Sequence, residues 1–278
     1  MKTSQQVPAK SLIYVWLGAG AISTLLPFVW MVLSSLKTRN EMTSVPPAVL
    51  PSTPQWGNYP SALSMAPFLR YFFNTLLVAG GTTLAVVLTS ILAGFAFAKL
   101  DFKFKNYVFV GMISLMMIPG EMLVITNFQT VVNFGWIDSY LAMIVPFAVN
   151  IFYIYLMRNY FIGIPGTLYN AAKVDGCSDW QFLWKILVQN AKPGIVTVGI
   201  LTFINSWNAF LWPFLVTNDP KMRLLNNGLV AFVTEAGSDP QLQMAASTMI
   251  VIPIVIVYFF ARKQIINGIG GGTGGTKS

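Results

Sequence analysis

The residues best suited to a specific interaction lie in one polar segment, 158–193, between long apolar runs. Ser178 and Gln181 are three residues apart, the spacing at which each side chain bonds the other's backbone N–H and starts a helix. A helix is therefore predicted after Ser178. The turn dipeptide formed by Asp175 and Gly176 ends a helix before it. The predicted unit is a helix, a sharp turn and a second helix.

The side chains on this unit would suit a docking element for a soluble partner. The second helix, 179–189, carries large apolar residues on one stripe at helical spacing: Trp180, Leu183, Trp184 and Leu187. The first helix has Leu168, Ala171, Ala172 and Asp175 at the same spacing, and its small Ala side chains would let another surface come close. The chain has no histidine, so zinc sites and acid–base triads lose their commonest component. An amphipathic connector lying at the lipid interface is the alternative.

A second polar group lies inside an apolar run. Asn205, Asn208 and Trp212 are spaced i, i+3 and i+7, so one helix would place two amides and an indole on one face. Amides bind hydroxyl groups, and aromatic rings pack on the C–H faces of a sugar ring, which predicts a sugar-facing stripe. Helix-to-helix contacts, through Asn side chains that seek a partner in hydrocarbon, are the alternative.

The composition indicates which elements must position these residues. Of 278 residues, 55% are apolar and 9% are charged, and the mean hydropathy is +0.64, as in integral membrane proteins. A helix of about 20 residues crosses the roughly 30 Å of hydrocarbon in a bilayer. We predict an all-α polytopic membrane protein, a single transmembrane domain over 1–278. Six spans are expected, at 12–33, 72–98, 107–125, 139–157, 194–216 and 243–261.

The distribution of Lys and Arg predicts how these spans are oriented. With the N-terminus inside, the inner segments hold twelve Lys and Arg and three acidic residues, and the outer segments hold five and six. The inner charge of +9 and the outer charge of −1 recover the net charge of +8. Cytoplasmic N- and C-termini and a cytoplasmic polar segment are therefore predicted, and nucleic-acid binding is not needed to explain the positive charge.

The polar segment resembles the cytoplasmic EAA loop of binding-protein-dependent ABC transporter permeases. That loop reads Glu-Ala-Ala, then Asp-Gly-Ala three residues on, then an Ile/Leu-Leu-Pro run and a downstream Pro. The matching positions are Ala171, Ala172, Asp175, Gly176, Ser178, Gln181, Ile186 and Pro193. Asn170 replaces the usual Glu and so lacks its charge, Cys177 replaces a small Ala, and Val188 and Gln189 stand where Leu and Pro are usual. The string 207–213 resembles the carbohydrate-uptake, maltose-permease-like branch of the family.

This resemblance implies one of two membrane subunits of an ATP-driven importer for a sugar or sugar-like solute, working by alternating access in the bacterial plasma membrane. The implied partners are a second permease, two copies of an ATPase that carries ATP and Mg²⁺, and an extracellular solute-binding protein. The ATPase-coupling residues would be Asn170, Ala171, Ala172, Asp175, Gly176, Ser178, Trp180 and Trp184 within the loop 158–193. The solute path would include Asn205, Asn208 and Trp212.

Neither catalysis nor a metal or cofactor site is expected in this chain itself, and the glycine-rich tail, 268–278, is expected to be flexible. Three other functions stay open. The chain could serve an importer for a non-sugar solute such as glycerol phosphate, a secondary transporter, or a scaffold that transports nothing. Ion coupling in secondary transporters commonly uses intramembrane charges, and Glu121 is the one carboxylate near a predicted span.

Overall fold

The computed structural model describes residues 6–234 and 237–270. Within these ranges the regular secondary structure is helical apart from one antiparallel pair of two-residue strands, β1 (Val233–Thr234) and β2 (Gly237–Ser238). The chain divides into two compact units. The first comprises Met1–Phe68 with Gly228–Pro253, and the second comprises Leu69–Asn227 with Ile254–Ser278.

The first unit contains α1 (Gln6–Ser35), α2 (Arg39–Thr43), α3 (Asn58–Ser64), η6 (Leu229–Phe232) and the start of α15 (Pro240–Gly270). The described side chains of α1 are mostly exposed until its last turns, as expected of a helix that faces lipid or another subunit. The Asn58 amide fixes the end of α1, because it donates to the carbonyls of Ser35 at 2.8 Å and Lys37 at 2.9 Å.

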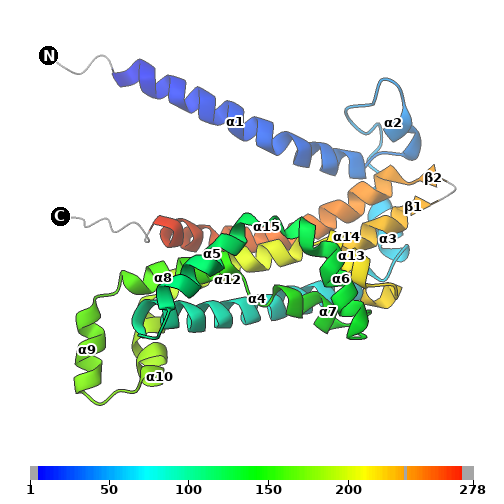
Figure 1. Cartoon of the computed structure of the whole chain (residues 1–278). Helices are drawn as coiled ribbons and strands as arrows, with labels where there is room; N and C mark the ends of the chain where they lie inside the picture. Colours follow the sequence, from blue (N-terminus) through cyan, green and yellow to red (C-terminus); the bar gives the residue numbers. More distant parts are fainter. Residues whose placement is uncertain (1–5, 235–236, 271–278) are drawn as a thin grey trace. The chain divides into compact units, whose positions relative to one another are not determined.

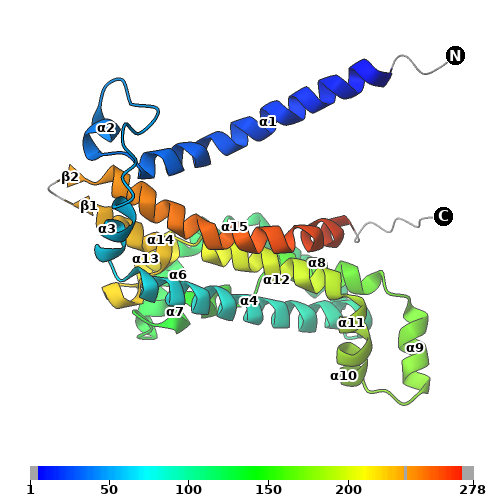
Figure 2. The same cartoon turned by 180° about the vertical axis from the view of Figure 1, so that it is seen from behind.

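The second unit holds the remaining helices (Figure 1). Its α-helices are α4 (Phe68–Lys99), α5 (Lys105–Ser114), α6 (Val124–Asn133), α7 (Tyr140–Ile144), α8 (Ile151–Ile162), α9 (Gly166–Val174), α10 (Asp179–Phe182), α11 (Val188–Asn190), α12 (Lys192–Trp207), α13 (Leu211–Val216) and α14 (Leu225–Gly228). Shorter helical turns are η1 (Leu115–Met117), η2 (Gly120–Leu123), η3 (Val145–Phe147), η4 (Leu183–Leu187) and η5 (Pro220–Met222). In both views α4 and α12 run alongside each other, and α9 and α10 project from one end of this unit (Figures 1 and 2).

Three described helices are each long and apolar enough to cross a membrane. They are Ile13–Ser35, Phe68–Lys99 and Pro240–Phe260, which match the first, second and sixth predicted spans. Pairs of bent helices bring the number of candidate spans to as many as six. Because α15 continues to Gly270, the predicted tail does not begin at 268, and 271–278 lie outside the described residues.

The other three predicted spans are not continuous helices, and prolines explain two of the breaks. At Pro119 the chain turns by 89° between Lys105–Met117 and Gly120–Asn133, so 107–125 is not one straight helix. A bend of 48° separates Tyr140–Phe147 from Ile151–Ile162 within the predicted span 139–157. Pro146 lies in the turn η3 that precedes this bend. A proline lacks the N–H that continues a helix and clashes with the preceding turn.

The predicted span 194–216 is also interrupted. Helix α12 ends at Trp207, and α13 starts only at Leu211. After the bend in the preceding span, a new helix starts at Asn150, whose side chain accepts from the backbone N–H of Phe152 at 3.0 Å and caps α8. Asn150 and Ala209, which lie at these two breaks, both line the cavity described below.

Small residues set how closely the helices of the second unit pack. A Cβ atom on Gly94 would lie 2.9 Å from the Met157 Cβ and 3.1 Å from the Arg158 backbone nitrogen. Gly94 therefore allows α4 and α8 to cross closely. A Cβ atom on Gly194 would lie 2.8 Å from the Tyr160 ring, so α12 also lies directly against α8.

Candidate functional site

The turn between α9 and α10 is built by two local motifs. The N–H of Cys177 donates to the carbonyl of Ala172 at 2.8 Å, and that of Gly176 donates to Lys173 at 3.1 Å, the bonds of a Schellman C-cap. Gly176 has a φ of +78°, which a residue without a Cβ adopts at little cost. Ser178 and Gln181 then exchange the two hydrogen bonds of the predicted capping box, at 3.2 and 3.0 Å. The helix–turn–helix, residues 166–190, is confirmed as a local structure.

A three-residue clasp joins the two helices across this turn. The Tyr169 hydroxyl donates to Asp179 Oδ1 at 2.6 Å, and Lys173 Nζ lies 2.7 Å from the same oxygen. The hydrogen bond from Lys173 and then that from Tyr169 lower the pKa of Asp179, and the bond to Asp179 raises the pKa of Lys173. Burial, then the Asp179 carboxylate, raises the pKa of Tyr169. The sequence analysis missed this clasp, although Tyr169 and Lys173 are spaced i and i+4 on α9.

The helix–turn–helix is anchored to the core of its unit by apolar side chains. Phe182, Leu183 and Leu187 are at most 1% exposed. Burying side chains of this size fully is worth about 1.5–3 kcal/mol each. Phe182 packs at ring-centroid distances of 4.9 Å from Tyr169 and 6.4 Å from Phe95 of α4. Any movement of the helix–turn–helix would therefore carry along the helices that hold it.

A charged side chain adds a further attachment. Lys99, the last residue of α4, donates from Nζ to the carbonyl of Ile164 at 2.7 Å, immediately before α9 begins. Helix α8 leads into α9 through residues 163–165, and α12 follows from the second helix at Ala191. Three long helices, α4, α8 and α12, thus end at the base of the helix–turn–helix.

The predicted docking residues divide into an exposed and a buried group. The exposed group is Asn170, Ala171, Asp175, Gly176, Ser178 and Trp180, and Trp180 is 61% exposed. Ala172 is only 5% exposed and belongs to the chain's own core, so an outside surface cannot touch it as predicted. Trp184 is half-buried and stacks edge-on against Trp180, with centroids 5.6 Å apart.

The predicted stripe on the second helix is confirmed at Leu183 and Leu187, which are buried, and at Trp184, which is half-buried, but not at Trp180. Residues Leu183–Leu187 form a π-helical turn, which contains more residues than an α-helical turn. Phe182, which precedes this turn, is buried, whereas Trp180 of the predicted stripe is exposed. Sequence periodicity alone carries no signal for such an insertion.

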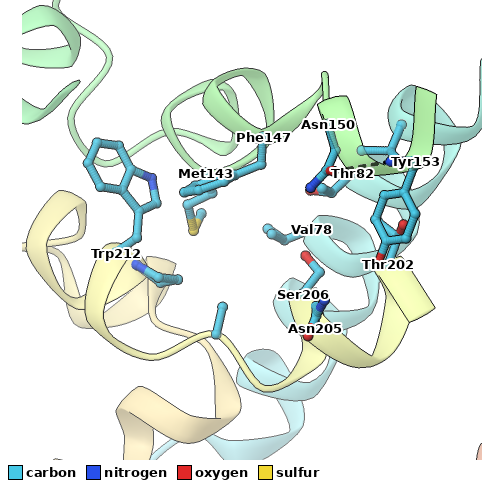
Figure 3. A pocket seen from close by; sticks show the side chains of 13 residues that line it. Val78, Thr82, Met143, Phe147, Asn150, Tyr153, Thr202, Asn205, Ser206 and Trp212 are labelled. Carbon is cyan, nitrogen blue, oxygen red and sulfur yellow. Dashed lines mark hydrogen bonds between the residues drawn. The ribbon is translucent and has the colours of Figure 1, made fainter. Parts of the chain in front are cut away.

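A cavity of about 370 Å³ lies between α4, α8, α12 and the broken segments around them. Figure 3 shows Trp212, Met143 and Phe147 on one side, and Asn150, Thr82 and Thr202 on the other, with Asn205 and Ser206 nearby. The other residues that line it are Val78, Val86, Tyr153, Ala209 and Pro213. The cavity thus has an aromatic side and a hydroxyl and amide side.

Two of the three predicted solute-path residues line this cavity. Asn205 and Trp212 do, whereas Asn208 does not. Asn208 caps the C-terminus of α12, so Asn205, Asn208 and Trp212 are not on one helical face as predicted. The Trp212 indole N–H donates to the carbonyl of Ala142 at 2.9 Å, which fixes the plane of its ring.

The hydroxyl of Thr82 has the property expected of a ligand-binding group. Thr82 is 4% exposed, and its Oγ1 finds no hydrogen-bond partner among the described residues. A buried hydroxyl without a partner is costly unless something else bonds it. Sequence analysis missed Thr82 because threonine is common in membrane helices, where it usually bonds the carbonyl four residues back.

Comparison with known proteins decides what kind of protein carries these two features. Residues 85–269 match the family described as binding-protein-dependent transport system inner membrane component. The chain belongs to this family. The permease is 30% identical over 248 residues to the arabinooligosaccharides transport system permease protein AraQ of Bacillus subtilis (strain 168), with 88% of each chain covered.

Two further comparisons extend over nearly the whole permease. It is 27% identical to the sn-glycerol-3-phosphate transport system permease protein UgpE of Agrobacterium fabrum (strain C58 / ATCC 33970), covering 94% of this chain and 96% of UgpE. Its fold is similar to that in the crystal structure of a bacterial ABC transporter involved in the import of the acidic polysaccharide alginate. That similarity has a TM-score of 0.82 at 24% identity and covers 95% of the permease and 99% of the other chain. The resemblance drawn from the polar segment and from 207–213 is confirmed.

Proposed function

We propose that the permease is one of two membrane subunits of an ATP-driven importer for a neutral sugar or sugar-like solute. The observation that carries this proposal is the helix–turn–helix, which buried contacts hold to three long helices. Its exposed tip consists of Asn170, Ala171, Asp175, Gly176, Ser178 and Trp180. An ATPase that grips the tip would move α4, α8 and α12 together. Such a movement would open the solute path alternately to each side of the membrane.

The partners follow from this role. Two ATPase copies would bind ATP and Mg²⁺, one of them at the tip of this helix–turn–helix. A second permease would complete the path, and an extracellular binding protein would deliver the solute. The permease would lie in the bacterial plasma membrane with both termini in the cytoplasm, in agreement with its excess of inner Lys and Arg.

The cavity supports a neutral solute. Its lining offers an indole and a phenyl ring beside hydroxyls and amides, the groups that bind the two faces of a sugar. None of the residues that line it is charged. A glycerol phosphate would place its negative charge here without a counter-charge, which is costly in a low-dielectric site.

Uptake into proteoliposomes that contain the assembled transporter tests this function. The proposal predicts that a neutral oligosaccharide accumulates in the vesicles. This accumulation should require the external binding protein, and ATP on the side of the membrane that carries the helix–turn–helix. The proposal also predicts that a phosphorylated polyol is not accumulated. Accumulation driven by an ion gradient without ATP would instead support a secondary transporter.

A further inference from the structure

A second cavity, of about 470 Å³, lies at the end of the second unit where α4 ends and α5 begins. Its lining combines aromatic rings with charged and amide groups: Phe97, Ala98, Asp101, Phe102, Phe104, Lys105, Asn106, Tyr107, Arg158 and Ile162. This cavity shares no residue with the one assigned to the solute. The importer function gives it no role.

Arg158 is held in place at this cavity without a neutralising carboxylate. Its Nε donates to the carbonyl of Phe97 at 3.3 Å, and its guanidinium carbon lies 4.1 Å from the centroid of the Phe109 ring. No ion pair joins Arg158 to an acidic residue within 6–234 and 237–270. The guanidinium is therefore oriented, and its charge is available to an anion.

The other charged groups leave the cavity with a positive balance. Lys105 Nζ donates to the carbonyl of Leu100 at 2.7 Å and lies 3.8 Å from Asp101 Oδ1. The Asp101 side chain is fully exposed and its contact with Lys105 is long, so it neutralises little. Two cations and one carboxylate leave a net charge of one positive on the lining, which a single phosphodiester would balance.

The cavity also lies where the headgroups of a bilayer are expected. Arg158 is in the C-terminal half of α8, Lys105 is the first residue of α5, and α4 ends at Lys99. Basic residues at helix ends reach the membrane interface, and aromatic residues gather at the same depth. Phe104 and Tyr107 on the rim are 59% and 80% exposed.

We propose that this cavity binds the phosphate headgroup of an acidic phospholipid, on the same side of the membrane as the helix–turn–helix. The Arg158 guanidinium would pair with the phosphate oxygens through its free N–H groups, and the exposed rings would contact the glycerol and the upper acyl chains. Basic cavities between membrane helices bind acidic headgroups in this way. An unshaped positive surface would attract the same lipids, but without depending on this one side chain.

Native mass spectrometry of the detergent-solubilised full-length chain tests the site. The probes are phosphatidylglycerol and phosphatidylcholine with identical acyl chains, and the variants are Arg158→Gln, Arg158→Lys and Arg262→Gln. Arg262 is the control, because it too lies over a phenyl ring, 5.7 Å from the Phe259 centroid, but it is exposed and outside the cavity. Circular dichroism and gel filtration check that each variant is folded.

We expect the chain to retain phosphatidylglycerol in preference to phosphatidylcholine. Arg158→Gln should weaken this retention about fivefold, the effect of one charge at a membrane surface, while Arg158→Lys and Arg262→Gln keep most of it. Equal loss in Arg158→Gln and Arg262→Gln, or no loss in either, would overturn the site. Displacement by millimolar inorganic phosphate would overturn the lipid assignment. Neither solute nor ATP enters this measurement, so its outcome is separate from that of the transport test.

Discussion

At the scale of single residues, Thr82 offers the least disruptive test of the solute cavity. Its hydroxyl has no partner to lose within the described structure, so Thr82→Val should leave folding unchanged. If the Thr82 hydroxyl forms a hydrogen bond with a solute hydroxyl, losing this hydrogen bond costs about 1 kcal/mol of binding free energy. The KM for uptake should then rise about fivefold, as measured from initial rates in proteoliposomes.

A neighbouring threonine provides the control for this substitution. The Thr83 hydroxyl donates to the carbonyl of Ala79 at 2.7 Å and does not line the cavity. Thr83→Val removes the same group one residue away and should not change KM. A Thr82→Val permease with an unchanged KM would show that the solute does not bind this hydroxyl.

The stability of the clasp between Tyr169, Lys173 and Asp179 should depend on pH. Because the pKa of Asp179 is lowered, its stabilising contribution is present above the ordinary carboxyl pKa of about 3.9 and is lost as pH falls through the lowered value. Lys173 has a raised pKa, so its contribution is present below its ordinary pKa and is lost as pH rises through the raised value. The clasp should therefore be fully formed near neutral pH.

Hydrogen exchange measures the clasp directly. At pH 7, Asp179→Asn should speed the exchange of backbone amides in 166–179 severalfold, because the substitution removes the ion pair with Lys173. The difference from the unmodified permease should shrink as the labelling pH falls below the lowered pKa of Asp179. Equal exchange at pH 7 would mean that the clasp does not hold the two helices together.

At the scale of elements, two adjacent alanines separate docking from folding. Ala171 is exposed at the tip, whereas Ala172 is in the core. Ala171→Asp should leave folding intact and reduce ATP-driven uptake by tenfold or more, equivalent to about 1.4 kcal/mol of coupling, while ATP hydrolysis continues. Ala172→Asp should instead lower the amount of folded permease, since it buries an unpaired carboxylate. Fluorescence-detected gel filtration measures the amount of folded permease for each variant.

The crossing of α4 and α8 is tested by a single methyl group. The Cβ of Gly94→Ala would meet the Met157 Cβ and the backbone of Arg158, neither of which can swing away. Overpacking of this kind costs about 1–3 kcal/mol, so the thermal midpoint in detergent should fall. Gly111→Ala on α5 has nothing within 4 Å and should leave the midpoint unchanged or slightly higher. Equal midpoints for the two variants would rule out the close crossing.

Sequence patterns predicted those elements that local chemistry determines. The capping box at Ser178, the stop at Gly176 and the long apolar helices depend on neighbouring residues, and the structure contains the first two and three of the six predicted helices. The π-helical turn at Leu183–Leu187 and the break after Trp207 do not follow from a repeating period. The cavity was predicted only in part, because Thr82 and Asn150 reach it from helices distant in the chain.

At the scale of the molecule, the second unit has two chemically different ends. One end carries the helix–turn–helix, Lys99, Lys105 and Arg158. At the other, Asn74 donates to the carbonyls of Lys221 at 2.9 Å and Arg223 at 3.0 Å, and accepts from the Tyr140 hydroxyl at 2.7 Å. The basic end with the helix–turn–helix is expected to face the cytoplasm.

Site-directed photocrosslinking tests most directly whether an ATPase grips the helix–turn–helix. Cys177→Ala removes the only cysteine, after which Ala171→Cys or, as the control at the other end of the unit, the exposed Asn218→Cys carries a thiol-reactive photoprobe. We predict a covalent adduct between the permease and its ATPase from position 171 and none from position 218. An adduct from 218 alone, or none from 171 in an assembled transporter, would contradict the proposed coupling.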